Sequence, residues 1–189
     1  GVSSAASDVY KRQVMGGGKP EGAFVPKKED VVPPCAVKTL PVQDGDVFDL
    51  GGVQIEAIAV PGHTVGTMVY LDRARRVLYS GDACNANTLL GLPCSTTVET
   101  YAKSLDHLAT YLKGIDKFYG GHGLQAVPAY IVDEALILCE EILSDDDDRF
   151  ETEFLGRKFL YARKFDGMFH REDGGIANIA YVMEKVYNK

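Results

Sequence analysis

Short apolar segments that alternate with polar positions recur along the chain from residue 37 onwards. In residues 53–60 the odd-numbered positions are Val53, Ile55, Ala57 and Ala59, which is the period-two pattern of a half-buried β-strand. Segments rich in Gly, Pro, Asp or Arg separate this run from others of its kind. We expect strands at residues 37–42, 46–50, 53–60, 67–72, 76–81 and 115–121, and in the tail at 152–156, 158–165, 168–171 and 176–183.

Two longer segments have apolar residues at helical spacing. In residues 95–112 the apolar side chains recur every three or four positions, at Val98, Tyr101, Leu105, Leu108 and Leu112. Thr96 followed by Glu99 has the spacing of a capping box. A second helix is predicted from near Pro128, a residue favoured in first turns, to the acidic run 145–148. Strands, helix, strand, helix and strands in this order predict an α/β fold with helices covering the sheets.

Composition narrows the class of protein without identifying it. A chain of 189 residues, 46% hydrophobic and 25% charged, fits one globular domain with a real core. The net charge of −7 argues against nucleic acid or an anionic membrane surface as a partner. No apolar run approaches the ~18 residues that a membrane-spanning helix needs. We therefore expect neither a nucleic-acid nor a membrane partner, and the oligomeric state cannot be read from the sequence.

The beginning of the chain differs from the rest. Residues 1–13 (GVSSAASDVYKRQ) have no apolar core of a secretory signal and join abruptly to a Gly- and Pro-rich stretch at 14–36. We expect residues 1–13 to be a non-native leader and residues 14–189 to be a partial domain. The native N-terminus would then lie upstream, so any targeting signal would be missing from this sequence.

The four cysteines, Cys35, Cys84, Cys94 and Cys139, show no CxxC spacing. We interpret them as free, partly buried thiols, which favours a reducing compartment such as the cytoplasm. A disulfide or a zinc–thiolate role is the alternative.

Three residues capable of binding metal follow three predicted strands. His63 lies in PGHT, Asp82 in SGDA and His122 in GGHG. Binding residues concentrate on loops that a rigid scaffold positions, and glycines beside them allow a close approach of the backbone. Taken singly, each has a plain explanation: a turn histidine, a turn aspartate and a flexible glycine loop. Together, two imidazoles and one carboxylate suit zinc, iron or manganese.

Other polar residues are weaker candidates. His107 lies on the first predicted helix and is expected at the surface, and His170 is expected not to be a ligand. The four aspartates at 145–148 are expected to form a solvated loop, because adjacent like charges repel one another. Tyr119 and Asn85 are close in sequence to the candidate ligands and are possible substrate contacts.

The three motifs resemble those of the metallo-β-lactamase superfamily: PGHT followed by Gly66, SGDA at residues 80–83 and GGHG at residues 120–123. The resemblance covers residues 37–141 and implies a four-layer αβ/βα sandwich of two packed sheets with helices outside. It also implies one or two bound metal ions, usually zinc, with iron or manganese as alternatives. His63 would then bind the first metal ion, Asp82 would bridge both and His122 would bind the second.

The resemblance further implies a metal-dependent hydrolase. A metal-bound hydroxide would attack an ester, thioester, lactone or amide-type bond of a small-molecule substrate, and Asp82 would be catalytic by orienting the attacking water. The substrate and its binding residues are unknown. One alternative is an iron-dependent redox member of the same superfamily, and another is a binding module that has lost its metal site.

One family signature is missing from this sequence. The His-x-His-x-Asp-His loop should precede PGHT, but no histidine occurs before His63. A catalytic zinc normally has three protein ligands and a water molecule, so the expected ligand set is short. We therefore expect a C-terminal fragment of an enzyme, with an incomplete sandwich and no activity of its own. The retained motifs favour this interpretation over a natural relative that has lost its metal.

Overall fold

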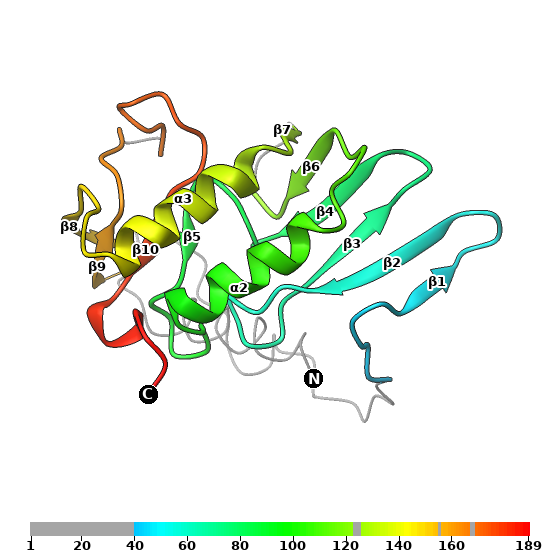
Figure 1. Cartoon of the computed structure of the whole chain (residues 1–189), viewed down its shortest axis with the longest axis horizontal. Helices are drawn as coiled ribbons and strands as arrows, with labels where there is room; N and C mark the ends of the chain where they lie inside the picture. Colours follow the sequence, from blue (N-terminus) through cyan, green and yellow to red (C-terminus); the bar gives the residue numbers. More distant parts are fainter. Residues whose placement is uncertain (1–39, 123–125, 155, 167–168) are drawn as a thin grey trace, which may run out of the picture. The chain divides into compact units, whose positions relative to one another are not determined.

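The structure is a computed structural model, and it describes residues 40–122, 126–154, 156–166 and 169–189 (Figure 1). The chain divides into two compact units, Gly1–Pro41 and Val42–Lys189, and every described strand and helix lies in the second. The predicted leader at 1–13 lies outside the described residues and stays a prediction. Residues 40–42 form no strand, so the expected strand at 37–42 is wrong in its described part.

A mixed sheet of six strands carries the candidate ligands. Its spatial order is β1-β2-β3-β4-β6-β7, and neighbouring strands are antiparallel except β4 and β6, which run parallel. The alternating patterns at 46–50, 53–60, 67–72, 76–81 and 115–121 are confirmed as strands. Their bounds are β1 (Val47–Asp49), β2 (Gln54–Ala59), β3 (Met68–Asp72), β4 (Val77–Gly81), β6 (Lys117–Gly120) and, unpredicted, β7 (Val127–Pro128).

Alternation along these strands separates a buried face of the sheet from an open one. Side chains at neighbouring register positions fill the core beneath the helices: Leu71, Leu78 and Phe118. The adjacent residues point to the opposite face, where a row of tyrosines remains exposed: Tyr70, Tyr79 and Tyr119. The rings of Tyr79 and Tyr119 stack with centroids 6.1 Å apart. Tyr119 is thus part of this row, and its predicted role as a substrate contact stays a prediction.

Two helices lie side by side against the buried face, α2 (Val98–Ala109) and α3 (Ile131–Leu143) (Figure 1). The apolar stripe predicted for α2 is confirmed, because Val98, Tyr101, Leu105 and Leu108 are all fully buried. Its cap lies one residue later than expected. The side chain of Thr97, not Thr96, accepts a hydrogen bond from the Thr100 amide at 3.1 Å.

The start of the second helix was predicted three residues too early. Pro128 ends the short strand β7, where it pairs with Lys117, and α3 begins at Ile131. Proline suits a strand edge as well as a first helical turn, so its presence alone did not decide between them. Four residues expected on the apolar stripe of α3 are nevertheless buried: Val132, Ala135, Cys139 and Ile142. Leu136 and Leu143, expected there too, are only partly buried, and Leu138 is buried in addition.

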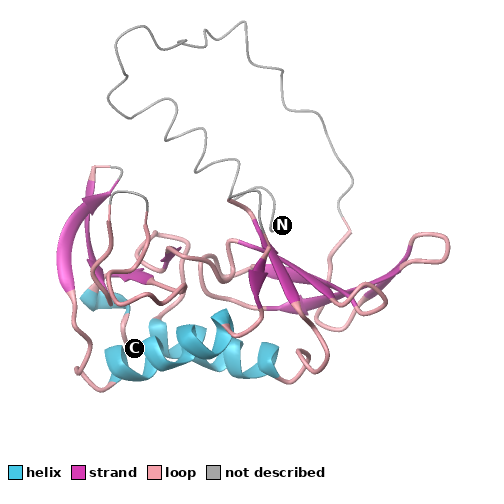
Figure 2. Ribbon diagram, turned by 90° about the horizontal axis from the view of Figure 1, so that it is seen from above, coloured by secondary structure: helices cyan, strands magenta, loops and turns pink. Residues whose placement is uncertain are grey.

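A second sheet, in the order β5-β10-β9-β8, is built mostly from the tail. Its strands are β5 (Thr88–Leu89), β8 (Phe150–Phe154), β9 (Arg157–Tyr161) and β10 (Ile179–Tyr181), followed by the short 3₁₀ helix η2 (Met183–Lys185). The strand expected at 168–171 is absent from its described part, where Arg171 makes only an isolated bridge to Phe165. Both sheets lie on the same side of the helix pair (Figure 2). Among the described residues, no helix is both long and apolar enough to cross a membrane.

Candidate metal centre

The topology of the six-stranded sheet explains why three distant residues meet. β2 and β4 are both antiparallel to β3, and β6 is parallel to β4, so β2, β4 and β6 all run in one direction. Their carboxyl ends therefore lie at the same edge of the sheet. His63 follows β2, Asp82 follows β4 and His122 follows β6. This topology brings both imidazoles into contact with the Asp82 carboxylate.

Asp82 is the point at which the two imidazoles converge. His63 Nε2 lies 3.9 Å from Asp82 Oδ2, and His122 Nε2 lies 3.2 Å from Asp82 Oδ1. For ligand atoms around one tetrahedral zinc ion at ~2.0–2.1 Å, mutual distances of about 3.3 Å are expected. The His122 contact matches this spacing, and the His63 contact is somewhat longer. Each imidazole faces a different carboxylate oxygen.

The His63 ring has a defined orientation. Its Nδ1 lies 3.0 Å from the backbone carbonyl oxygen of Leu89 in β5. A carbonyl oxygen only accepts hydrogen bonds, so Nδ1 carries the proton and donates it. In the neutral imidazole, Nε2 is then the unprotonated nitrogen, and it is the atom that faces Asp82. Metal-binding histidines commonly have this arrangement, in which one ring nitrogen is held by an acceptor and the other is a ligand.

One oxygen of Asp82 lacks a hydrogen-bond donor. Asp82 Oδ1 is shielded from solvent, and its 3.2 Å contact with His122 does not have hydrogen-bond geometry. Within the part of the chain that the structure describes, Oδ1 therefore has no hydrogen-bond partner. A buried carboxylate oxygen without a partner is costly unless something else binds it. The donor types of the cluster, two imidazole nitrogens and a carboxylate oxygen, are those that zinc, iron and manganese bind.

The glycines of these motifs have specific steric roles. A Cβ atom at Gly121 would lie 2.9 Å from Asp82 Oδ1, so this glycine lets the GGHG loop approach the carboxylate. Gly81 has a φ of +52°, a left-handed conformation in which glycine is favoured. Gly62 differs from the expectation, because a Cβ atom there would lie 2.3 Å from the Tyr101 ring. The Gly62 backbone thus approaches helix α2.

The remaining histidines lie apart from this cluster. His107 Nε2 contacts Asp44 at 3.0 Å, and His170 Nδ1 contacts Asp166 at 3.2 Å; both imidazoles are solvent-exposed. These positions agree with the surface location predicted for His107. No group of three or more His, Cys, Asp or Glu side chains within the described ranges is gathered tightly enough to hold a metal ion as it stands. The ligand roles of His63, Asp82 and His122 therefore stay a prediction.

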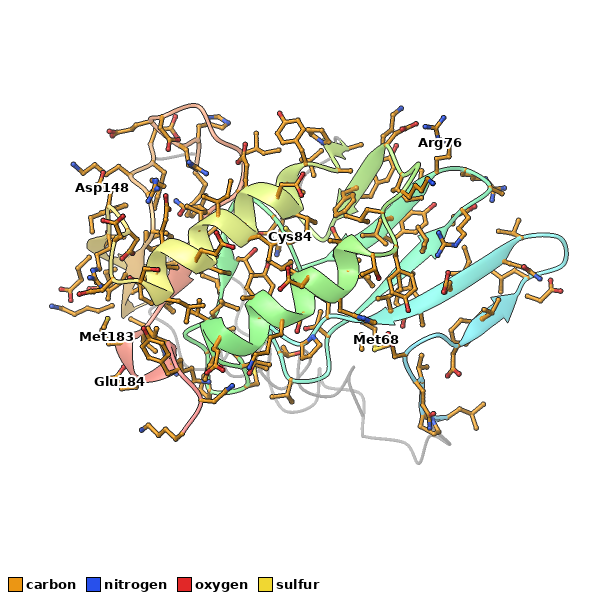
Figure 3. All side chains as sticks on the ribbon, viewed as in Figure 1. Met68, Arg76, Cys84, Asp148, Met183 and Glu184 are labelled. Carbon is orange, nitrogen blue, oxygen red and sulfur yellow. The ribbon has the colours of Figure 1, made fainter. Side chains whose placement is uncertain are left out.

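The cysteines and the acidic run also have clear positions. Cys84, Cys94 and Cys139 are free thiols, and Cys35 lies outside the described residues. Cys84 lies beneath the two helices (Figure 3), and burial raises the pKa of its thiol to about 12. It is therefore protonated near neutral pH. The solvated loop predicted at 145–148 is wrong for one residue, because the Asp147 side chain is fully buried and accepts a hydrogen bond from the Tyr181 hydroxyl at 2.7 Å.

Three further residues complete the surroundings of the cluster. Leu89 contributes only its backbone carbonyl, and Tyr101 contributes the ring face that packs on Gly62. Asn85, predicted as a substrate contact, accepts a hydrogen bond from the Asn87 amide through its side-chain oxygen. No residue type marks a backbone acceptor, so sequence reasoning had no signal for Leu89.

A comparison with known protein families identifies the superfamily of this chain. The family model described as metallo-beta-lactamase superfamily matches residues 9–149, which is well over half of the chain. The chain belongs to the metallo-beta-lactamase superfamily. The fold class follows from this membership: the helix layer and the sheets described above are consistent with an incomplete αβ/βα sandwich. Members of the superfamily typically bind metal ions, and hydrolases are among them.

Two relatives resemble part of the chain. Acyl-coenzyme A thioesterase MBLAC2 of Bos taurus is 31% identical over 86 residues, which cover 44% of this chain and 31% of the relative. Hydroxyacylglutathione hydrolase of Brucella anthropi is 35% identical over 101 residues, which cover 51% of this chain and 36% of the relative. This superfamily member thus spans about a third of the length of these relatives.

Among solved structures, a metallo-beta-lactamase family protein from Thermus thermophilus is similar with a TM-score of 0.46 and 22% sequence identity. The similarity covers 77% of this chain and 50% of that protein.

Proposed function

We propose that His63, Asp82 and His122 are ligands of a metal centre, with zinc as the expected ion, in a hydrolase of the metallo-beta-lactamase superfamily. The observation that carries this proposal is the convergence of two imidazole nitrogens on Asp82, one oxygen of which has no hydrogen-bond donor among the described residues. Iron or manganese would suit the same donors. The proposed partner is a small-molecule substrate.

The relatives favour thioesters as the substrate class. One is named a thioesterase that acts on acyl-coenzyme A, and another a hydrolase of hydroxyacylglutathione, which is also a thioester. Both activities add water to a thioester carbonyl and release a thiol and a carboxylic acid. We propose the same reaction type for the protein to which this sequence belongs. Esters, lactones and amides remain poorer candidates, because neither of these relatives is named for them.

The residues of this chain have distinct roles in such a reaction. A bound divalent ion would polarise the substrate carbonyl and lower the pKa of a water molecule. His63 would offer Nε2 as a ligand because the Leu89 carbonyl holds its Nδ1 proton. Asp82 presents an oxygen without a donor, able to accept a hydrogen bond from the attacking water and thus to orient it. His122 would be a further ligand, on the Oδ1 side of the Asp82 carboxylate.

Metal binding by this chain alone should be weak. Four-ligand structural zinc sites bind with roughly 10–16 kcal/mol, and the described residues offer only three candidate side chains. A dissociation constant no tighter than about 1 μM, or ~8 kcal/mol, is therefore expected. Turnover of substrate should be absent or barely measurable, because a short ligand set holds the ion poorly in the geometry that the reaction needs.

Zinc titration of the full chain tests this proposal, with an acyl-coenzyme A and a hydroxyacylglutathione as thioester probes. We expect one weak zinc site that Asp82→Asn removes. Any slow hydrolysis should disappear with the same substitution and with a chelator. Zinc affinity unchanged by Asp82→Asn would contradict the proposal, and iron in place of zinc in the purified protein would point to the redox alternative.

A further inference from the structure

We propose that Ser95 is a positioning residue for His63 and that Lys185 fixes the loop that carries Ser95. This inference rests on the proposed metal centre, since it concerns how one of its ligands is held. Ser95 lies in the loop between β5 and α2, and Lys185 ends η2 near the C-terminus. Neither residue belongs to the three motifs, and neither contacts Asp82 or His122 in the described structure.

The Ser95 hydroxyl contacts two backbone carbonyl oxygens, that of His63 itself and that of Leu89. Its Oγ donates to the backbone carbonyl of His63 at 2.7 Å and lies 3.3 Å from the carbonyl of Leu89. The Leu89 carbonyl is the acceptor that holds the His63 ring through Nδ1. Ser95 is only 5% exposed, and its Oγ also accepts a hydrogen bond from the Leu92 amide at 3.2 Å. The Ser95 side chain therefore connects the His63 backbone to the Leu89 carbonyl, which accepts the hydrogen bond from the His63 ring.

Backbone hydrogen bonds on both sides of Ser95 hold the same two loops together. The Thr96 amide donates to the Gly62 carbonyl at 2.9 Å, and the Val65 amide donates to the Cys94 carbonyl at 2.9 Å. These two bonds therefore lie on either side of the Ser95–His63 contact along both loop segments. A shift of the 92–96 loop would therefore move the PGHT turn with it, and with it the His63 imidazole.

Lys185 holds the 92–96 loop from its outer side. Its Nζ donates to the carbonyls of Leu92 at 2.8 Å and Ser95 at 2.5 Å, and it lies 3.4 Å from the carbonyl of Pro93. An ammonium group has three donors, and three carbonyl oxygens surround it here. Without a cation these converging carbonyl dipoles would repel one another, so Lys185 stabilises the curvature of the loop. The tail of the chain is thereby linked to a metal ligand.

The affinity for a metal ion should depend on this connection between Lys185, the 92–96 loop and His63. When a residue that hydrogen-bonds to a metal ligand is removed, the metal affinity typically falls by 10–100-fold. We expect Ser95→Ala to weaken Co²⁺ binding by about tenfold or more. Lys185→Met should weaken it by somewhat less, about threefold to tenfold, because it acts through the loop rather than on His63 directly. Ser95→Thr and Lys185→Arg keep the donors and should restore most of the affinity.

The experiment compares these variants of the full chain by Co²⁺ titration, by the visible spectrum of the Co²⁺ complex and by thermal unfolding without metal. Thr110→Ala is a matched control, because the Thr110 hydroxyl donates at 2.7 Å to the carbonyl of His107, which is not a proposed ligand. Lys158→Met is the control for Lys185, since its Nζ pairs with Glu151 at the surface. We expect Ser95→Ala and Lys185→Met to lower the affinity and alter the spectrum, and both controls to leave them unchanged.

The outcomes separate this inference from the proposed function. If His63→Ala binds Co²⁺ as tightly as the wild type, the proposed metal centre is wrong and the positioning role fails with it. If His63→Ala weakens binding but Ser95→Ala and Lys185→Met do not, only the positioning role is overturned. Equal losses in Ser95→Ala and Thr110→Ala would also overturn it, since the effect would then be general. Should Ser95→Ala fail to fold, Lys185→Met and its rescue by Lys185→Arg decide alone.

Discussion

The two imidazoles of the candidate metal centre are held in very different ways. The His63 side chain is 20% exposed, its Nδ1 is bonded to the Leu89 carbonyl and its backbone accepts a hydrogen bond from Ser95. The His122 side chain is 84% exposed, and within the described residues its ring contact is with Asp82. The Gly121 amide, one residue earlier, donates to the Gly81 carbonyl at 2.9 Å. One imidazole is thus held by packing and the other mainly by its contact with Asp82.

This difference indicates that only half of the centre is preorganised. A ligand that is already oriented loses little conformational freedom when a metal ion binds, whereas an exposed side chain must be ordered at that moment. His63 and Asp82 therefore define where an ion would bind, and His122 adapts to it. The difference also predicts an order of importance among substitutions.

The largest effect should come from Asp82, on which both imidazoles converge. Asp82→Asn removes the charge and one strong acceptor, so zinc affinity should fall by about a hundredfold or more. Isothermal titration of the variant against the wild type measures this loss. Asp116→Asn is the matched control, because Asp116 is exposed and pairs only at the surface with Arg76. An equal loss in both variants would mean that the effect does not come from the cluster.

The next effect distinguishes the two histidines directly. Ordering an exposed side chain costs roughly 0.5–1.5 kcal/mol, which His122 incurs on binding and His63 does not. His63→Ala should therefore weaken zinc binding about threefold to tenfold more than His122→Ala does, measured by competition with a zinc-sensitive dye. A larger loss from His122→Ala would reverse the comparison.

The glycines give a third test, with stability as the first readout. Gly62→Ala places a methyl group 2.3 Å from a buried aromatic ring, so the free energy of unfolding should fall. Overpacking of this kind costs about 1–3 kcal/mol. Gly121→Ala would place its methyl group 2.9 Å from Asp82 Oδ1, the end of a side chain that can rotate, and 3.4 Å from the Gly81 carbonyl carbon. It should therefore cost less stability but weaken zinc binding. Denaturant unfolding and zinc titration of both variants separate the two effects; similar stability losses would show that the GGHG loop is as tightly packed as the PGHT turn.

The smallest effect concerns Cys84, which lies two residues after Asp82 and is fully buried. Burial raises the pKa of its thiol to about 12, so at pH 9 only about one molecule in a thousand carries the thiolate. Alkylation of Cys84 in the folded protein should therefore stay slow from pH 7 to pH 9, as followed by peptide mass spectrometry. Labelling of Cys84 as fast as in urea-unfolded chain would indicate that the Asp82 loop opens readily.

Local pattern predicted most of the central sheet and the buried stripes of both helices, because alternation and helical spacing depend on neighbouring residues. The positions of His63, Asp82 and His122 just after three predicted strands also marked them in advance as one candidate set. The supports of His63 were not predictable, because Leu89 acts through its backbone and Ser95 and Lys185 are distant in sequence. Pro128 was misassigned because proline suits a strand edge as well as a first helical turn. Asp147 was misassigned because its burial depends on Tyr181, which lies in the distant strand β10.

Anomalous X-ray diffraction from crystals of the full chain soaked in zinc tests the central claim most directly. The account predicts a zinc peak between His63, Asp82 and His122, with Nε2 of His63 and a carboxylate oxygen of Asp82 about 2.0–2.2 Å from the ion. Zinc peaks only elsewhere, with this cluster empty at millimolar zinc, would contradict it.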